Sequence, residues 1–157
     1  MKAASLNELK QELNTRPQKE ILAACLRLAK FKKENKELLT FLLFEAGDLQ
    51  SYIQNVKTEI DDQFSLVNKT NLYFAKKSVR KILRIINKFI RYATSKETEV
   101  ELLIYFCIKL KESGISMRKS TALTNLFNMQ IKKINKVMVQ LHEDLQYEYL
   151  KDLEKLS

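Results

Sequence analysis

The sequence predicts an all-α fold of seven or eight antiparallel helices in a single domain that spans residues 1–157. The chain has only two glycines and one proline, and folds rich in strands use these residues at their many turns. Hydrophobic residues make up 45% of the sequence. They recur at helical spacing, with none of the sustained alternation that strands show. These observations indicate few, long helices.

Serine and threonine residues mark where several of these helices begin. A serine or threonine followed three residues later by Glu or Gln is typical of a capping box, in which each side chain accepts a hydrogen bond from the other residue's backbone N–H. Pro17 is expected in the first turn of the second helix, where its missing N–H costs nothing. Capping boxes are predicted at Ser5 with Glu8, Thr15 with Gln18, and Thr94 with Glu97.

Polar stretches and glycines separate the helices that follow. Residues 32–36 divide the second helix from the third, and residues 68–71 divide the fourth from a basic fifth helix that runs to about Ala93. Gly47 and Gly114 are each expected just past the end of a helix, because glycine tolerates the left-handed conformation common there. The apolar residues of the first six helices lie within 6–13, 21–29, 38–43, 49–64, 79–90 and 100–110.

The last forty residues contain no helix-breaking residue. No glycine or proline occurs after Met117, so the pattern fits either one helix of up to ~60 Å or two helices joined near His142. We favour two helices, because the charge changes sign near His142 and a single helix of that length would overrun a small domain.

Two segments share one order of elements: a helix, a polar turn, a second helix and a terminal glycine. The first passes through Ile21-Leu22, Leu38-Leu39-Thr40-Phe41 and Gly47, and the second through Ile82-Leu83, Leu102-Leu103-Ile104-Tyr105 and Gly114. Ile82-Leu83 follows Ile21-Leu22 by 61 residues, and Leu102-Leu103 follows Leu38-Leu39 by 64 residues. This duplicated helical hairpin resembles the HEAT/armadillo-like α-solenoid repeats over residues 17–114, which implies stacked hairpins. An antiparallel helical bundle is the alternative.

The net charge of +9 is unevenly distributed along the chain. Residues 63–96 carry nine positive side chains and no negative one, and residues 113–142 carry five positive and no negative one. Residues 143–157 have a net charge of −3. Two basic blocks therefore stand between neutral or acidic segments, which indicates a localised charged surface.

Most cations of the first basic block share one face of the predicted fifth helix. On a helical wheel they fall within about 60° of Lys77, while the apolar residues of the same helix gather on the opposite side. Tyr73 and Tyr92 flank the cations, one toward each end, and we expect both rings to stack on bases. The six cations, here called the basic stripe, are Lys77, Arg80, Lys81, Arg84, Lys88 and Arg91.

Repulsion within this helix needs an explanation that folding does not supply. Seven pairs of like charges are three or four residues apart between 76 and 91, and together they cost about 1.5–3.5 kcal/mol at low salt. In one explanation the acidic residues Asp144, Glu148 and Asp152 lie across the stripe. In the other an external polyanion neutralises it: the backbone of RNA or DNA, an acidic protein partner, or an anionic lipid. A solvated surface with no role is the third possibility.

A second group of cations extends the predicted polyanion site. We expect these side chains to project away from the apolar side of the seventh helix, and the two groups would merge into a groove if the fifth and seventh helices are neighbours. The tyrosines make single-stranded RNA or DNA at least as good a fit as duplex. The cations of the second group are Arg118, Lys132, Lys133 and Lys136.

The sequence offers no catalytic constellation. One histidine, His142, and two distant cysteines cannot form the common zinc sites, and two isolated glycines cannot form a phosphate-binding loop. We therefore expect no cofactor, no metal and no enzymatic activity. The longest apolar runs fall short of the ~20 residues of a membrane span, and the few cysteines indicate a reducing, cytoplasmic setting.

These observations predict a non-enzymatic binding module that contacts a polyanion, with nucleic acid as the leading class. The cations would contact phosphates without distinguishing the base sequence. The alternative function is a helical-repeat scaffold for protein–protein interaction that self-associates. That alternative predicts an exposed apolar patch.

Overall fold

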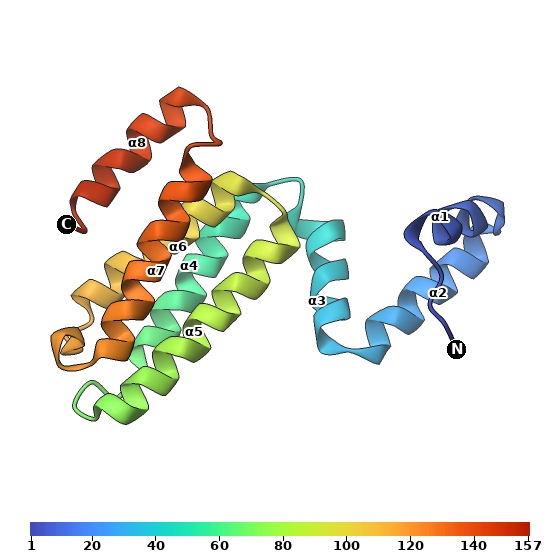
Figure 1. Cartoon of the computed structure of the whole chain (residues 1–157). Helices are drawn as coiled ribbons and strands as arrows, with labels where there is room; N and C mark the ends of the chain where they lie inside the picture. Colours follow the sequence, from blue (N-terminus) through green and yellow to red (C-terminus); the bar gives the residue numbers. More distant parts are fainter. The chain divides into compact units, whose positions relative to one another are not determined.

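The chain folds into helices throughout, in a computed structural model that describes all residues, Met1–Ser157 (Figure 1). The all-α prediction is confirmed: eight α-helices are joined by turns, one π-helical segment and one 3₁₀ turn, with no strand. No helix is both long enough and apolar enough to cross a membrane. Where the sequence predicts one domain, the internal contacts fall into two compact units, Met1–Phe44 and Glu45–Ser157.

The first unit contains three helices: α1 (Leu6–Thr15), α2 (Gln18–Phe31) and α3 (Lys33–Thr40). The capping box of Ser5 and Glu8 is confirmed, with Ser5 N–H donating to Glu8 Oε2 at 2.7 Å. The box predicted at Thr15 and Gln18 is wrong. Thr15 Oγ1 donates instead to the Glu12 carbonyl at 2.8 Å, and Pro17 caps α2 without a side-chain hydrogen bond.

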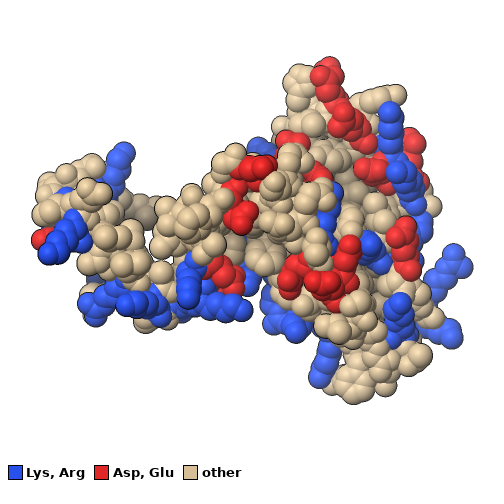
Figure 2. All heavy atoms as spheres, turned by 180° about the vertical axis from the view of Figure 1, so that it is seen from behind, with Lys and Arg blue, Asp and Glu red and all other residues tan.

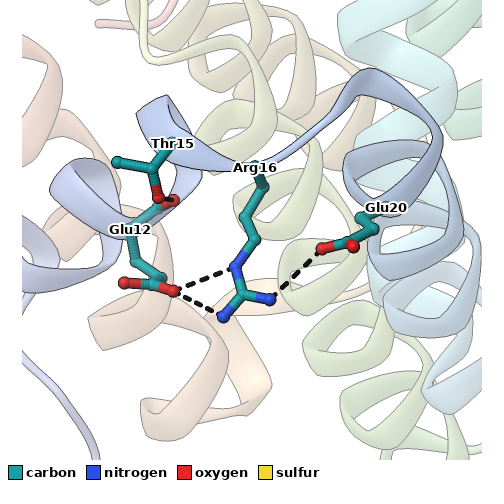
Figure 3. A network of polar contacts seen from close by, with 4 residues as sticks. All are labelled: Glu12, Thr15, Arg16 and Glu20. Carbon is teal, nitrogen blue, oxygen red and sulfur yellow. Dashed lines mark hydrogen bonds and ion pairs between the residues drawn. The ribbon is translucent and has the colours of Figure 1, made fainter.

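An arginine connects the end of α1 with the start of α2. Arg16 Nε donates to Glu12 Oε1 at 2.9 Å, and its Nη1 donates to Glu20 Oε2 at 3.2 Å (Figure 3). All three side chains are more than half exposed, and ion pairs this exposed add at most about 1 kcal/mol. The corner between the two helices is therefore held weakly.

The third helix does not end at a left-handed glycine. It continues into the π-helical segment Phe41–Glu45, and Gly47 does not have a positive φ. The prediction for Gly47 is therefore wrong, because the widened π turn ends the helix first. The prediction for Gly114 is confirmed by its φ of 80°.

The second unit is a bundle built around one central helix. Its members are α4 (Leu49–Ser65), α5 (Leu72–Ala93), α6 (Lys96–Glu112), α7 (Thr121–Met138) and α8 (Glu143–Glu154), with a 3₁₀ turn, η2 (Met117–Lys119), before α7. Helix α6 packs against α4, α5, α7 and α8 (Figure 1). Its Leu102, Leu103, Phe106, Cys107 and Leu110 are completely buried. A helix whose buried apolar residues spread over more than half of its circumference must be covered by several neighbours.

Polar pairs attach the sides of α6 to its neighbours. Lys57 Nζ on α4 lies 2.7 Å from Glu101 Oε1, and both side chains are less than one-fifth exposed. The Tyr105 hydroxyl donates to Asp61 of α4 at 2.8 Å, and Lys109 Nζ lies 2.9 Å from the same carboxylate. Both sets of contacts join α6 to α4, and of the two ion pairs Lys57–Glu101 is the one shielded from water.

The corner between α5 and α6 differs from the predicted capping box by one residue. Thr94 ends α5 in the left-handed conformation, with φ 48°, and its N–H donates to the Ile90 carbonyl at 3.1 Å. Ser95 caps α6, accepting a hydrogen bond from Thr98 N–H at 3.2 Å. The prediction of a box at Thr94 and Glu97 is wrong, because Thr94 closes the preceding helix.

The two helices predicted after Met117 are present and meet at His142. The Nδ1 atom of His142 caps α8 by accepting from Asp144 N–H at 3.2 Å. Helix α8 packs on α6, where the Tyr149 hydroxyl donates to Glu101 Oε2 at 3.2 Å. Burial and the neighbouring Glu101 carboxylate raise the pKa of Tyr149.

Both pairs of helices in the predicted repeat are present, but they are packed differently. The first is α2 with α3, and neither helix has a buried side chain. The second is α5 with α6, which together supply much of the core of the second unit. The two copies share a sequence pattern but differ in burial. Most apolar side chains of α5 and α6 are buried, whereas those of α2 and α3 are not.

The buried Cys107 thiol predicts a loss of stability at alkaline pH. Burial raises the pKa of Cys107 from 9.0 to about 12, so between these values the folded state holds a proton that the unfolded state releases. The stabilisation is complete below pH 9 and is lost as pH rises toward 12, at most about 4 kcal/mol. Urea unfolding of the second unit measured at several pH values should show this decline.

A Cys107→Val variant provides the control for the alkaline decline. Its free energy of unfolding should lose the part of the decline that begins near pH 9 and keep the part caused by the raised pKa of Tyr149. An identical pH profile for the variant and the wild type would contradict the assignment to Cys107.

Candidate polyanion interface

Helix α5 carries the candidate interface and is well specified by local sequence. Asn71 caps it, accepting hydrogen bonds from Tyr73 N–H at 3.1 Å and Phe74 N–H at 3.2 Å. Its 22 residues contain no glycine or proline and extend over about 33 Å. Its buried apolar face, which includes Val79, Ile82 and Ile86, orients the opposite face toward solvent.

Five of the six cations of the basic stripe are exposed: Lys77, Arg80, Lys81, Arg84 and Arg91. None of these five forms an ion pair. Lys88 is half-buried, and its ammonium lies 5.2 Å from the centre of the Phe89 ring. The like-charge repulsion of α5 is therefore not relieved at these five positions by the chain's own carboxylates.

The acidic C-terminal residues do not cover the stripe. Helix α8 packs on α6, and none of the five exposed cations of the stripe forms an ion pair with a carboxylate of α8. Asp152 instead lies 3.0 Å from Lys155 Nζ. The interpretation in which Asp144, Glu148 and Asp152 neutralise the stripe is therefore wrong. Figure 2 shows, on one face, acidic side chains gathered in groups of their own.

The aromatic residues near the stripe differ from the prediction. Tyr73 is 57% exposed, with Lys77 Nζ 4.6 Å from the centre of its ring. Tyr92 is only 8% exposed and packs edge-on against Phe89. A base cannot stack on a buried ring, so the role predicted for Tyr92 is wrong.

The structure adds Phe74, which sequence reasoning missed. Its ring is 52% exposed and makes an edge-to-face contact with Tyr73, with ring centres 5.4 Å apart. The signal was present in the sequence, because Phe74 lies about 60° from Lys77 on the helical wheel. An aromatic residue on the polar face of an amphipathic helix is not explained by the core.

The second group of cations is only partly available for a ligand. Arg118, Lys132 and Lys136 are exposed. Lys133 instead lies 3.2 Å from Glu99 Oε1 and donates to Asn87 Oδ1 at 3.3 Å. It therefore joins α7 to α6 and α5, and its charge is compensated by Glu99.

Helices α5 and α7 do come together, at a shallow hollow of about 390 Å³. Arg91, Lys96 and Lys133 line it, and Glu99 lies in the same wall. Arg118, Lys132 and Lys136 do not line it. The two groups of cations therefore meet only at this hollow, where a carboxylate reduces the positive potential, and no continuous basic groove is formed.

Comparison with models of known protein families, with curated proteins and with solved structures finds no match. No group of three or more His, Cys, Asp and Glu side chains is placed to hold a metal ion. The function of this chain is therefore inferred from the residues of α5 and their surroundings.

Lys133 and its neighbour Lys132 should behave differently when neutralised. Lys133→Met removes an ion pair and a hydrogen bond that are half shielded from water, and we expect a loss of about 1 kcal/mol in the free energy of unfolding. Lys132→Met alters an exposed side chain and should change it by less than about 0.5 kcal/mol. Urea unfolding of both variants checks this, and equal effects would contradict the structural role of Lys133.

Proposed function

We propose that the second unit binds the phosphate backbone of single-stranded nucleic acid through the basic stripe of α5. The observation that carries the proposal is the set of five exposed cations without ion pairs, on a helix that has no acidic residue. Arginine and lysine contacts to phosphates supply most of the affinity of binding that is independent of sequence.

The dimensions of the stripe suit a short stretch of strand. Lys77 and Arg91 are fourteen residues apart, so their Cα atoms lie about 21 Å apart along the helix axis. The five exposed cations form a row over this length, four of them between Lys77 and Arg84 and the fifth at Arg91. The row accommodates several successive phosphates, which makes a site of a few nucleotides.

The aromatic residues favour a single strand over a duplex. Tyr73 and Phe74 lie at the N-terminal end of the stripe with about half of each side chain exposed. Base faces are accessible for stacking in single strands, whereas a duplex hides them. A base that stacks on Tyr73 displaces the Lys77 ammonium, which then lies close to the adjoining phosphate. These contacts are common to RNA and DNA.

Reversing two charges of the stripe should abolish most of the binding. For single-stranded RNA we expect a slope of log K against log salt of about −3 to −4, from four to six phosphate contacts. Arg80→Glu with Arg84→Glu should lower the affinity by roughly one to two powers of ten and make the slope shallower by about 1.4. Fluorescence anisotropy at several salt concentrations measures both quantities.

The matched control reverses two charges elsewhere in the same unit. Lys151→Glu with Lys155→Glu on and after α8 changes the net charge by the same amount and should affect the affinity only by a few-fold. The proposal fails if the wild type does not bind at low salt, or if the two double variants weaken binding equally.

Removing the exposed rings should weaken single-strand binding without changing its salt dependence. Tyr73→Ala and Phe74→Ala should each lower the affinity for single-stranded RNA by about tenfold, because stacking on a base contributes about 1–3 kcal/mol. The slope against salt should stay the same, since no phosphate contact is lost. Anisotropy with a duplex of the same sequence is the comparison, and equal losses for duplex and single strand would contradict the stacking role.

A further inference from the structure

Large apolar side chains are exposed throughout the first unit. Phe41 is its single buried residue. Eleven leucine and phenylalanine side chains of this 44-residue unit are exposed, whereas the 113 residues of the second unit expose seven large hydrophobic side chains. The eleven are Leu6, Leu9, Leu13, Leu22, Leu26, Leu28, Phe31, Leu38, Leu42, Leu43 and Phe44.

We propose that the first unit is a self-association arm, whose exposed apolar side chains on α1, α2, α3 and the π-helical segment pack against the same surface of a second copy of this chain. An isologous interface of this kind uses one surface twice, so the face needs only to be complementary to itself. The proposal is independent of nucleic-acid binding, because the basic stripe belongs to the other unit.

Helix α1 shows the arrangement most clearly. Leu6, Leu9 and Leu13 are spaced three and four residues apart, which places them on one strip of the helix, as in the contact seam of a coiled coil. Their exposed fractions are 86%, 47% and 47%. A helix of 10 residues is only marginally stable alone in water, so the seam requires an apolar partner.

The unit contains no cross-link of its own. A chain of about 40 residues rarely buries enough surface to fold alone, and usually relies on disulfides, a metal or association. The first unit contains no histidine and a single cysteine, Cys25, which is unpaired. It can therefore form neither an internal disulfide nor a common zinc site, and its stability depends on burying its apolar side chains.

The exposed apolar area matches what a stable dimer needs. The exposed fractions of the eleven side chains are equivalent to between six and seven fully exposed residues, or roughly 600–700 Å² at about 100 Å² of apolar surface for each. A standard interface buries about 800 Å² per partner, of which about 450–500 Å² is apolar. Burying roughly two-thirds to four-fifths of the exposed apolar area of each first unit would therefore supply the apolar part of a standard interface.

The surroundings of the seam favour protein over lipid. Helix α1 carries two acids and one cation, and α2 carries one acid and three cations, whereas helices that lie on anionic membranes are rich in cations and poor in acids on their polar face. Charges of both signs instead suit pairing with a second copy. The seven exposed hydrophobic residues of the second unit are spread over α5, α7, α8 and the ends of α4 and α7, so they present no comparable face.

Sedimentation velocity of the full-length chain tests the proposal. The wild type should sediment as a dimer, twice the 18.5 kDa of the chain, with a dissociation constant in the micromolar range. Leu9→Glu with Leu13→Glu should raise that constant at least about 100-fold, because two apolar contacts are lost and two charges are placed in the interface. Glutamate is a good helix former, so circular dichroism should show that α1 persists.

A matched double variant and a lipid measurement complete the design. Leu66→Glu with Val139→Glu changes two exposed apolar residues of the second unit, 78% and 68% exposed, and should leave the dimer intact. A monomeric wild type at about 100 µM, or equal dissociation of both double variants, overturns the proposal. Binding of a monomeric wild type to phosphatidylserine vesicles, lost in Leu9→Glu with Leu13→Glu, overturns it in favour of a membrane surface.

Discussion

The enclosure of α6 is the constraint on which the second unit depends. Leu102, Leu103 and Ile104 are all buried although each is turned by about 100° from the one before it around the helix, and a single narrow apolar stripe could not produce that. Covering every side takes α4, α5, α7 and α8 together. The cost of burying polar groups is limited by pairing Glu101 with Lys57 and Glu99 with Lys133. Enclosure also turns the apolar face of α5 inward, which leaves its cations outside.

The helices of this chain are largely predictable because their signals are local. The span of α5, the capping box at Ser5 and the break at His142 each follow from spacing within a few residues. Thr94 illustrates the limit. Thr94-Ser95 offers two successive capping side chains, and the choice between them depends on where α5 stops. That position is set by the left-handed turn of Thr94, which the sequence pattern does not reveal.

For the candidate site, a helical wheel predicts which residues of α5 are exposed, but it does not predict which helices are neighbours. Exposure of Lys77, Arg80, Lys81 and Arg84 follows from periodicity. The pairing of Lys133 with Glu99 does not, because it requires knowing which helices adjoin. The leucines of α1 and the aliphatic residues of α5 have the same helical spacing, yet one set is open and the other buried. Periodicity identifies an apolar face, but it does not identify what packs on it.

The uncompensated row of cations on α5 links folding to ionic conditions. Mobile counterions reduce repulsion between neighbouring cations, so added salt stabilises this helix. The same salt competes with any polyanion for those cations and weakens its binding. Ionic strength would therefore act in opposite directions on the native state and on the proposed complex. A polyanion bound as proposed would replace the counterions and raise the melting temperature most at low salt, where repulsion within α5 is strongest.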